Sequence, residues 1–140
     1  MAPRNWSAMW ATGKIHQRLG NSGEAFDWFA CAHDINPQHP DLAREAGIAA
    51  IEAGYPTAAV RMCMAAVALA PADSGLMANL ALAYLIDGRL EAAEAAITKS
   101  LSIAPDDPIS MRANRLIQRV AAGDLPCPKS GPEIMRALRE

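Results

Sequence analysis

A spacing of 34 residues recurs along this 140-residue chain and constrains its fold more than any other feature. Two sets of residues keep that spacing, namely Gly20, Gly54 and Gly88, and Pro37, Pro71 and Pro105. Glycine supplies the left-handed conformation in which many helices end, and proline cannot continue a helix. The pattern therefore predicts a chain built from repeats of one supersecondary unit.

The stretch from Ser74 to Pro105 indicates what one unit contains. Apolar residues recur at i, i+3, i+4 and i+7 on both sides of Gly88, with Met77 in the first set and Leu90 in the second. This periodicity is typical of amphipathic helices and not of strands. Each unit is predicted to be a hairpin of two helices.

Two further positions keep the same phase: Ala25, Ala59 and Ala93, and Ala32, Ala66 and Ser100. A 34-residue period of helix, turn, helix and proline resembles the tetratricopeptide repeat family. The resemblance covers about residues 6–120 and implies an all-α fold, a right-handed superhelix of antiparallel helix hairpins. The implied repeats occupy residues 6–39, 40–73 and 74–107, followed by a partial repeat at 108–122.

Within each repeat, the family pattern pairs a small residue at position 8 with a bulky residue at position 24. The chain supplies Gly13, Gly47 and Ala81 at the first position and Phe29, Cys63 and Ile97 at the second. Small residues permit close approach of two helices, and bulky ones fill the space between repeats. The sequence departs from the pattern at His16 and Ala50, where the family prefers larger apolar or aromatic residues.

The sequence predicts two regions, a repeat array at 1–122 and a C-terminal segment at 123–140. Pro126 and Pro128 exclude a regular helix where the fourth repeat would continue. Ser130 and Glu133 then form a predicted capping box for a helix from Pro132 to Arg139. Its apolar stripe consists of Ile134, Met135 and Leu138, and we expect it to cap the array. Earlier helix N-caps are predicted at Ser22 and Asp107.

Composition excludes several classes of function. A net charge of −2 gives no indication of a nucleic-acid or membrane partner. The longest charge-free runs are shorter than the roughly 20 residues that a membrane helix needs, and the first ten residues lack the apolar core of a signal peptide. Three cysteines at irregular spacing indicate free thiols in a reducing compartment, so a cytoplasmic location is expected.

The sequence carries no pattern for catalysis, a metal or a cofactor. Its three histidines form no ligand pair with the cysteines, and there is no phosphate-binding glycine loop or nucleophile elbow. We therefore expect a protein that is not an enzyme. Cys63 is expected in the core at its position 24, and Cys127 is expected to be exposed in the proline-flanked tail.

The resemblance implies a binding surface on the concave face of the superhelix, lined in this family mainly by positions 2, 5, 9 and 12 of each repeat. The candidate partner-binding residues at these positions are Trp10, Lys14, Gln17, Arg44, Ile48, Ile51, Ala78, Leu82, Leu85, Arg112, Leu116 and Arg119. The middle of the groove is thus apolar and its ends are basic. This suits an apolar partner segment with acidic flanks.

The helix predicted at 74–86 is apolar around almost its whole circumference, and such helices are buried. Its face at Leu82 and Leu85 should therefore be covered by a partner segment, a second copy of the chain or the chain's own tail. Tight curvature that packs the first helices against each other is the simpler alternative.

The main hypothesis is a non-enzymatic module that binds a partner peptide or helix in this groove. By fold alone, this is similar to the way bacterial secretion chaperones of the family hold their clients. The family's carboxylate clamp is not matched, because Trp10 and Ala78 stand where basic residues belong. The alternatives are a homodimeric scaffold that uses the apolar face or the incomplete fourth repeat, and part of a larger enzyme.

Overall fold

The computed structural model describes residues 5–139, which form eight α-helices and no strand. The helices are α1 (Trp6–Arg18), α2 (Ser22–Ile35), α3 (Pro40–Ala53), α4 (Pro56–Leu69), α5 (Ser74–Ile86), α6 (Leu90–Ile103), α7 (Pro108–Ala121) and α8 (Gly131–Leu138). The all-α class predicted from the periodicity is confirmed.

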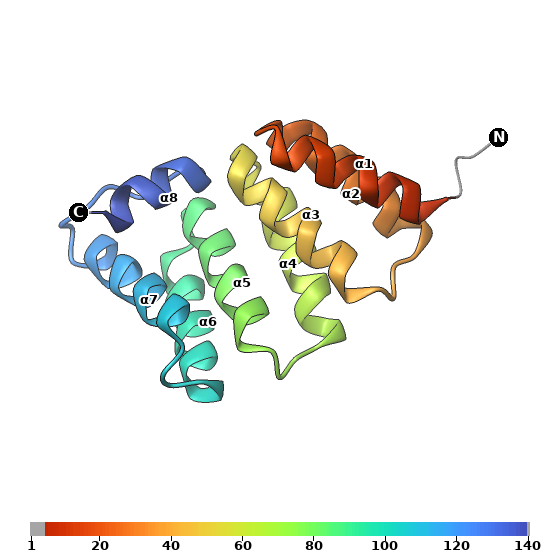
Figure 1. The fold of residues 1–140 in the computed structure, drawn as a ribbon. Coiled ribbons are helices and arrows are strands. Elements are labelled where there is room, and N and C mark those ends of the chain that lie inside the picture. The colour runs from red at the N-terminus through yellow and green to blue at the C-terminus, as the bar shows by residue number, and fades with distance from the viewer. Residues whose placement is uncertain (1–4, 140) are drawn as a thin grey trace.

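The first seven helices form a solenoid of antiparallel hairpins, in which each helix packs against the next one along the chain. The first helices of the hairpins, α1, α3, α5 and α7, line one face, and α2, α4 and α6 stand behind them (Figure 1). The last helix, α8, does not continue this order and lies across the ends of the first-helix layer (Figure 1). The arrangement is the predicted right-handed superhelix with a displaced terminal element.

The helices begin at side chains that repeat every 34 residues. The N-caps of α1, α3, α5 and α7 are Asn5, His39, Asp73 and Asp107, and each side chain accepts a hydrogen bond from a backbone N–H of the first turn. The predicted Asp107 cap is confirmed, and its hydrogen bonds from the Ser110 hydroxyl and N–H lower the pKa of the carboxyl. The Ser22 cap was wrong by one residue, because Asn21 is the N-cap and makes no side-chain bond.

The turns between helices depend on glycine in the left-handed region. Gly54 has φ of 75°, and the N–H of the following Tyr55 bonds to the carbonyl of Ala50 at 2.8 Å. Gly20 and Gly88 adopt φ of 80° and 76° and are followed by the same bond. These bonds satisfy carbonyls that the helix end leaves without partners. The 34-residue glycine spacing is thus the spacing of a repeated helix stop.

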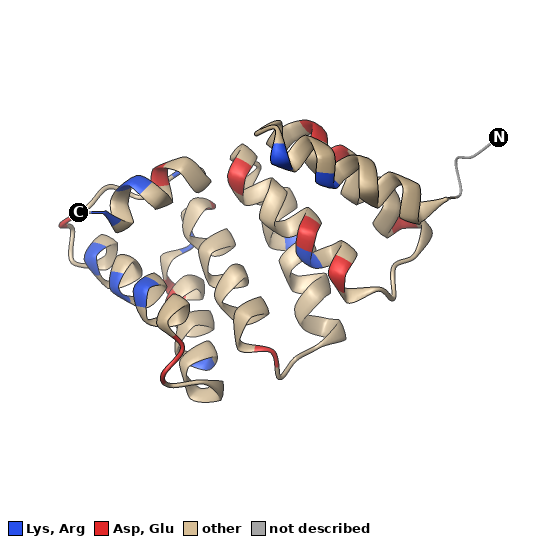
Figure 2. Ribbon diagram, in the orientation of Figure 1, with Lys and Arg blue, Asp and Glu red and all other residues tan. Residues whose placement is uncertain are grey.

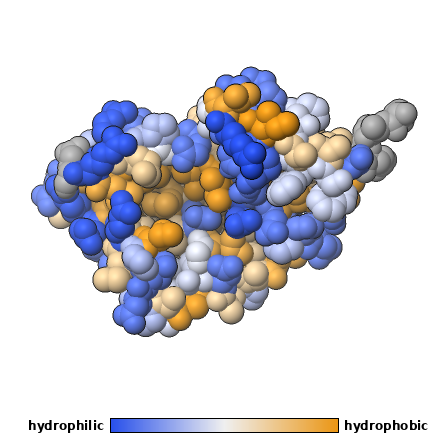
Figure 3. All heavy atoms as spheres, in the orientation of Figure 1, coloured by the Kyte–Doolittle hydropathy of each residue, from blue (hydrophilic) through white to orange (hydrophobic). Residues whose placement is uncertain are grey.

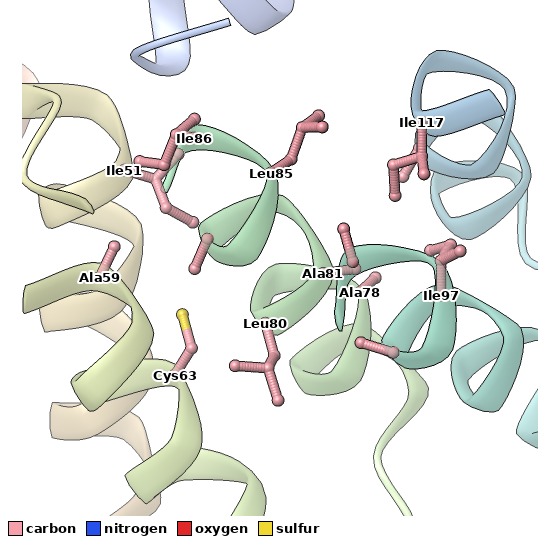
Figure 4. Packing of buried hydrophobic residues seen from close by; sticks show 14 of the residues in the cluster. Ile51, Ala59, Cys63, Ala78, Leu80, Ala81, Leu85, Ile86, Ile97 and Ile117 are labelled. Carbon is pink, nitrogen blue, oxygen red and sulfur yellow. The ribbon is translucent and has the colours of Figure 1, made fainter. Parts of the chain in front are cut away.

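The packing of position 8 against position 24 follows the predicted pattern. A Cβ atom built on Gly13 would lie 2.6 Å from the ring of Phe29, and one built on Gly47 would lie 2.7 Å from Cys63 Sγ. Neither helix could approach its neighbour this closely with a larger residue. Buried side chains fill the space between repeats. Figure 4 shows this for Cys63, Leu80 and Ile97 in the core between α4, α5 and α6.

We predict that Gly13→Ala destabilises the protein by about 1–3 kcal/mol, because the added methyl must displace the Phe29 ring. At a solvent-exposed helix position, Gly→Ala stabilises a protein by about 1 kcal/mol, so the sign of the change in unfolding free energy tests the packing argument. Urea unfolding followed by circular dichroism measures it.

Gly75→Ala is the matched control, since Gly75 lies in an exposed first turn and its added Cβ would approach only the Asp73 side chain, at 3.3 Å. Adding Phe29→Leu to Gly13→Ala should restore part of the lost stability. Equal effects of the two glycine substitutions would contradict the packing argument.

Candidate functional site

The concave face contains an apolar pocket of about 260 Å³ where four helices meet. Of the candidate residues, Ile51 of α3, Leu82 of α5 and Arg112 of α7 line it together. The other lining residues are Glu52, Ile109, Ala113, Gly131, Ile134, Met135 and Leu138. Figure 3 shows this hollow as an apolar area below α8 and between α7 and α3. The pocket is therefore made jointly by the array and by the C-terminal helix.

Several candidate residues lie beneath this surface. Leu85 is fully buried, and Leu116, Ala78 and Ile51 are buried as well, while Leu82 is half-buried. The chain's own tail covers part of the face, because Leu125 and Cys127 of the linker and Leu138 of α8 pack against the same core. The tail thus shares in covering this face, and the neighbouring first helices α3 and α7 also pack against α5, as expected for tight curvature.

The tail is attached by several specific contacts. The Cys127 thiol donates to the carbonyl oxygen of Leu85 at 2.9 Å, and Ile134 is buried at 4% exposure. Ser130 caps α8 as predicted. The second half of the capping box differs from the prediction, since Glu133 accepts from the N–H of Lys129, at 3.3 Å, and not from that of Ser130. The helix spans Gly131–Leu138, which is one residue earlier at each end than the predicted Pro132–Arg139.

The cysteines have three different environments. Cys31 is exposed, and Cys63 is buried in the core as predicted, where desolvation raises its pKa from 9.0 to about 12. The expected exposure of Cys127 is corrected, because its side chain is partly buried against α5. Burial is also the main reason that the pKa of Cys127 is raised.

The candidate residues of the first repeat lie at the opposite end of the groove from α7 (Figure 1). Lys14 Nζ lies 2.5 Å from Glu45 Oε2 and 5.8 Å from the centre of the Trp10 ring. The Trp10 indole N–H is buried and has no hydrogen-bond partner among residues 5–139. Gln17 and Ile48 are half-buried here, and exposed Arg44 pairs with Asp41 at 3.3 Å. The basic groups at this end are thus already engaged by acidic ones.

The α7 end of the groove is different in charge. Residues 108–140 carry six basic and three acidic side chains, whereas residues 1–107 carry seven basic and twelve acidic ones. Blue bands mark this basic run along α7 (Figure 2). Arg112 and Arg115 are exposed and form no ion pair within the described part of the chain, and half-buried Arg119 lines the adjoining hollow.

Sequence reasoning did not identify all of the pocket. Glu52 and Met135 line it, although neither was a candidate residue. The sequence places Met135 in the apolar stripe of the last helix. Where that helix packs depends on the proline-containing linker, and the repeat pattern does not predict it. Glu52 lies beside the α8 N-terminus, close to Gly131, and has no signal in the sequence.

Stacked helix hairpins with an open concave face define a helical-repeat solenoid, and the comparisons identify the repeat. A family model described as tetratricopeptide repeat matches residues 44–108. The repeats predicted from the 34-residue period thus match tetratricopeptide repeats over residues 44–108, and the array has the fold of solved tetratricopeptide repeat domains.

Solved structures of low sequence identity share the fold. The first tetratricopeptide domain of Spaghetti (RPAP3), bound to the HSP90 peptide SRMEEVD, has a TM-score of 0.74 at 21% identity, over 84% of this chain and 93% of that one. MamA from Desulfovibrio magneticus gives 0.77 at 20%, over 97% and 75%. An O-GlcNAc transferase of Thermobaculum terrenum gives 0.70 at 19%, over 81% and 22%. Comparison with curated proteins gave no match.

Residues 5–139 contain neither a membrane-spanning helix nor a cluster suited to a metal ion. None of their helices combines the length and the apolar character that crossing a membrane requires. No cluster of three or more His, Cys, Asp or Glu side chains within this range has the arrangement to hold a metal ion.

We predict that Ile134→Ala lowers the free energy of unfolding by about 2–5 kcal/mol if the array and α8 unfold together, because it removes the buried anchor of α8. The exposed neighbour Met135→Ala should change it by less than about 0.5 kcal/mol. Denaturant titration distinguishes the two. If Ile134→Ala leaves the main transition unchanged, the tail unfolds separately from the array.

The thiol environments predict an order of reaction with Ellman's reagent at neutral pH. Cys31 should react at once, Cys127 more slowly because it is partly covered, and Cys63 only after unfolding. Mass spectrometry of the modified peptides assigns each rate. Rapid modification of Cys63 in the folded protein would contradict the burial described for it.

Proposed function

We propose that this protein is a non-enzymatic interaction module, and that the pocket between α3, α5, α7 and α8 holds an apolar side chain of a partner peptide or helix. The observation that carries the proposal is the pocket itself, an apolar hollow with basic residues on one rim. Tetratricopeptide repeat proteins use such concave faces to bind protein segments.

The apolar part of the proposal follows from what lines the pocket. Ile109 and Met135 line it with 65% and 48% of their surface exposed, and Leu82 lines it as a half-buried residue. A volume of about 260 Å³ accommodates one large aliphatic or aromatic side chain. Flexible methionine on the rim adapts to different shapes, so the pocket is suited to an anchor residue.

The acidic part follows from the arginines of α7. Arg112 lines both the apolar pocket and the adjoining hollow, and Arg115 stands beside it. Neither has an acidic partner within residues 5–139, so a carboxylate next to the anchor would gain an ion pair without displacing an existing one. Lys14 is a poorer binding site for a carboxylate of the partner, since Glu45 already neutralises its charge.

The peptide bound by the RPAP3 domain, SRMEEVD, combines apolar and acidic residues, and this likeness supports the same chemistry here. The place of the acidic contact would differ from the family's clamp, whose basic residues belong to the first and third repeats. In this chain the first helix has Trp10 and a paired Lys14, so we assign the carboxylate to the α7 end.

The alternative proposal is a homodimer through the apolar face or the incomplete fourth repeat. Leu85 and Leu116 are buried in a core that the tail shares, so such a dimer must form on the remaining rim around Ile109 and Met135 or displace α8. The partner-segment proposal requires no such displacement and is preferred.

Synthetic peptides of about ten residues with one central leucine or tryptophan test the proposal, with either glutamate or lysine in the flanks. We predict that the glutamate series binds more tightly in fluorescence polarisation. Arg112→Glu should reverse this preference, because it replaces attraction by repulsion. Arg61→Glu, on the opposite layer of helices, is the matched control and should leave it unchanged.

Met135→Glu should weaken binding of every peptide at least about tenfold, because it places a charge on the apolar rim. Met64→Glu is its control, since Met64 is similarly exposed, at 51%, but lies on α4. If both methionine variants bind like the wild type, the pocket is not the binding site. Capture from a native extract, compared between these two variants, then provides candidates for the physiological partner.

A further inference from the structure

The pocket between α3, α5, α7 and α8 has a charged residue on each of two walls. Among the described residues that line it, only Glu52 and Arg112 are charged, and the others are apolar or glycine. Glu52 belongs to the last turn of α3, and Arg112 belongs to the second turn of α7. Both residues are exposed, and neither forms an ion pair within residues 5–139. Two opposite charges are therefore available to a bound segment.

The two charges lie on different sides of the pocket. Helix α5 contacts both α3 and α7 and stands between them (Figure 1). Packed neighbouring helices have axes about 8–10 Å apart, so the axes of α3 and α7 are separated by about twice that distance. Figure 2 shows acidic colour at the α8 end of α3 and basic colour along α7. Glu52 and Arg112 thus mark two separated ends of one apolar hollow.

Helix α8, which forms the remaining wall, brings no charge to the pocket. It lines the pocket only with apolar residues and glycine, whereas its Glu133 and Arg136 line a separate hollow beside the linker. The difference in charge along the pocket is therefore set by the residues on α3 and α7.

The Glu52 carboxylate is held in place by the N-terminus of α8. A Cβ atom built on Gly131 would lie 2.5 Å from Glu52 Cδ and 2.6 Å from each carboxylate oxygen, so the carboxylate occupies the space that a side chain at Gly131 would need. Gly131 is the first residue of α8, and a helix N-terminus favours a negative charge beside it. The carboxylate is thus a positioned charge, and the exposure of Glu52 leaves room for a cation to approach.

We infer that Glu52 makes the pocket select a partner segment with opposite charges on the two sides of its apolar anchor. An acidic residue pairs with Arg112, as in the proposed function on which this inference rests, and a lysine or arginine pairs with Glu52. In an extended segment, the residues two before and two after the anchor lie about 13 Å apart, so their side chains reach towards both walls. A uniformly acidic segment would instead bring a carboxylate towards Glu52, and this repulsion disfavours it.

Peptides with glutamate on one side of a central leucine, and lysine, glutamine or glutamate on the other, test the inference in both orders of charge. In the order that matches the direction of binding, lysine should lower the dissociation constant about two- to fivefold relative to glutamine, the range expected for an exposed ion pair. Glutamate in that place should raise it. Fluorescence polarisation measures each constant. If glutamine binds as tightly as lysine in both orders, the inference is wrong.

Substitutions of Glu52 identify the group that reads the basic flank. Glu52→Gln should remove the advantage of lysine, and Glu52→Lys should reverse it, so that glutamate in that place binds best. Glu91→Gln, at an exposed position of α6 in the other layer of helices, is the matched control and should keep the wild-type order. A lysine advantage that survives Glu52→Gln would overturn the inference.

Loosening of α8 would give a different result from loss of the Glu52 charge. It would weaken the binding of all peptides alike and expose Cys127, so the rate at which Cys127 reacts with Ellman's reagent verifies that the tail stays docked in both Glu52 variants. The experiment also separates this inference from the proposed function. If Arg112→Glu reverses the preference for acidic flanks while Glu52→Lys has no effect, only the role of Glu52 is wrong. A peptide set that never binds overturns both.

Discussion

The close approach of two helices within each hairpin is the contact on which the rest of the structure depends. It is made possible by Gly13 and Gly47, whose missing side chains leave room for Phe29 and Cys63. Because this spacing is fixed, the first helices lie side by side and form one continuous concave face. The pocket follows from that face, since its walls are neighbouring first helices and its remaining side is the chain's own tail.

The array was predictable from sequence because each of its contacts is made within a repeat or between neighbouring repeats. The 34-residue spacing therefore predicts three features together: the helix ends, the N-caps, and the packing of a small residue against a bulky one. Gly54 is an example of a helix end, and Asp107 is an example of an N-cap. The C-terminal segment obeys no such period. Its helix and its cap at Ser130 were identified from local signals, but local signals do not say which face Ile134 packs against.

The difference between the candidate site and the observed pocket has the same cause. Positions taken from the family pattern place Leu85 and Leu116 on the groove, but both are buried, in a core that also includes Leu125 and Cys127 of the tail. Helix α5 is apolar around most of its circumference, as predicted. Part of this apolar surface packs inside the protein, at Leu85, whose carbonyl oxygen accepts a hydrogen bond from Cys127 of the linker. The part of the groove that stays open lies nearer to α7 than predicted, at the pocket lined by Ile109, Met135 and Arg112. The fold could thus be predicted from the periodicity, whereas the surface that stays open could not.

The contact between α8 and α3 brings together segments that are far apart in the chain, with Gly131 close to Glu52 and the Lys129 carbonyl close to Gly54. Apart from the contact of α8 with α7, the other main helix contacts join helices of the same repeat or of neighbouring repeats. Hairpins of this kind form rapidly because little loop entropy is lost, whereas the docking of α8 requires a preassembled surface from two hairpins and α7. The tail is therefore expected to be the last element to order during folding, and the binding pocket becomes complete only at that final step.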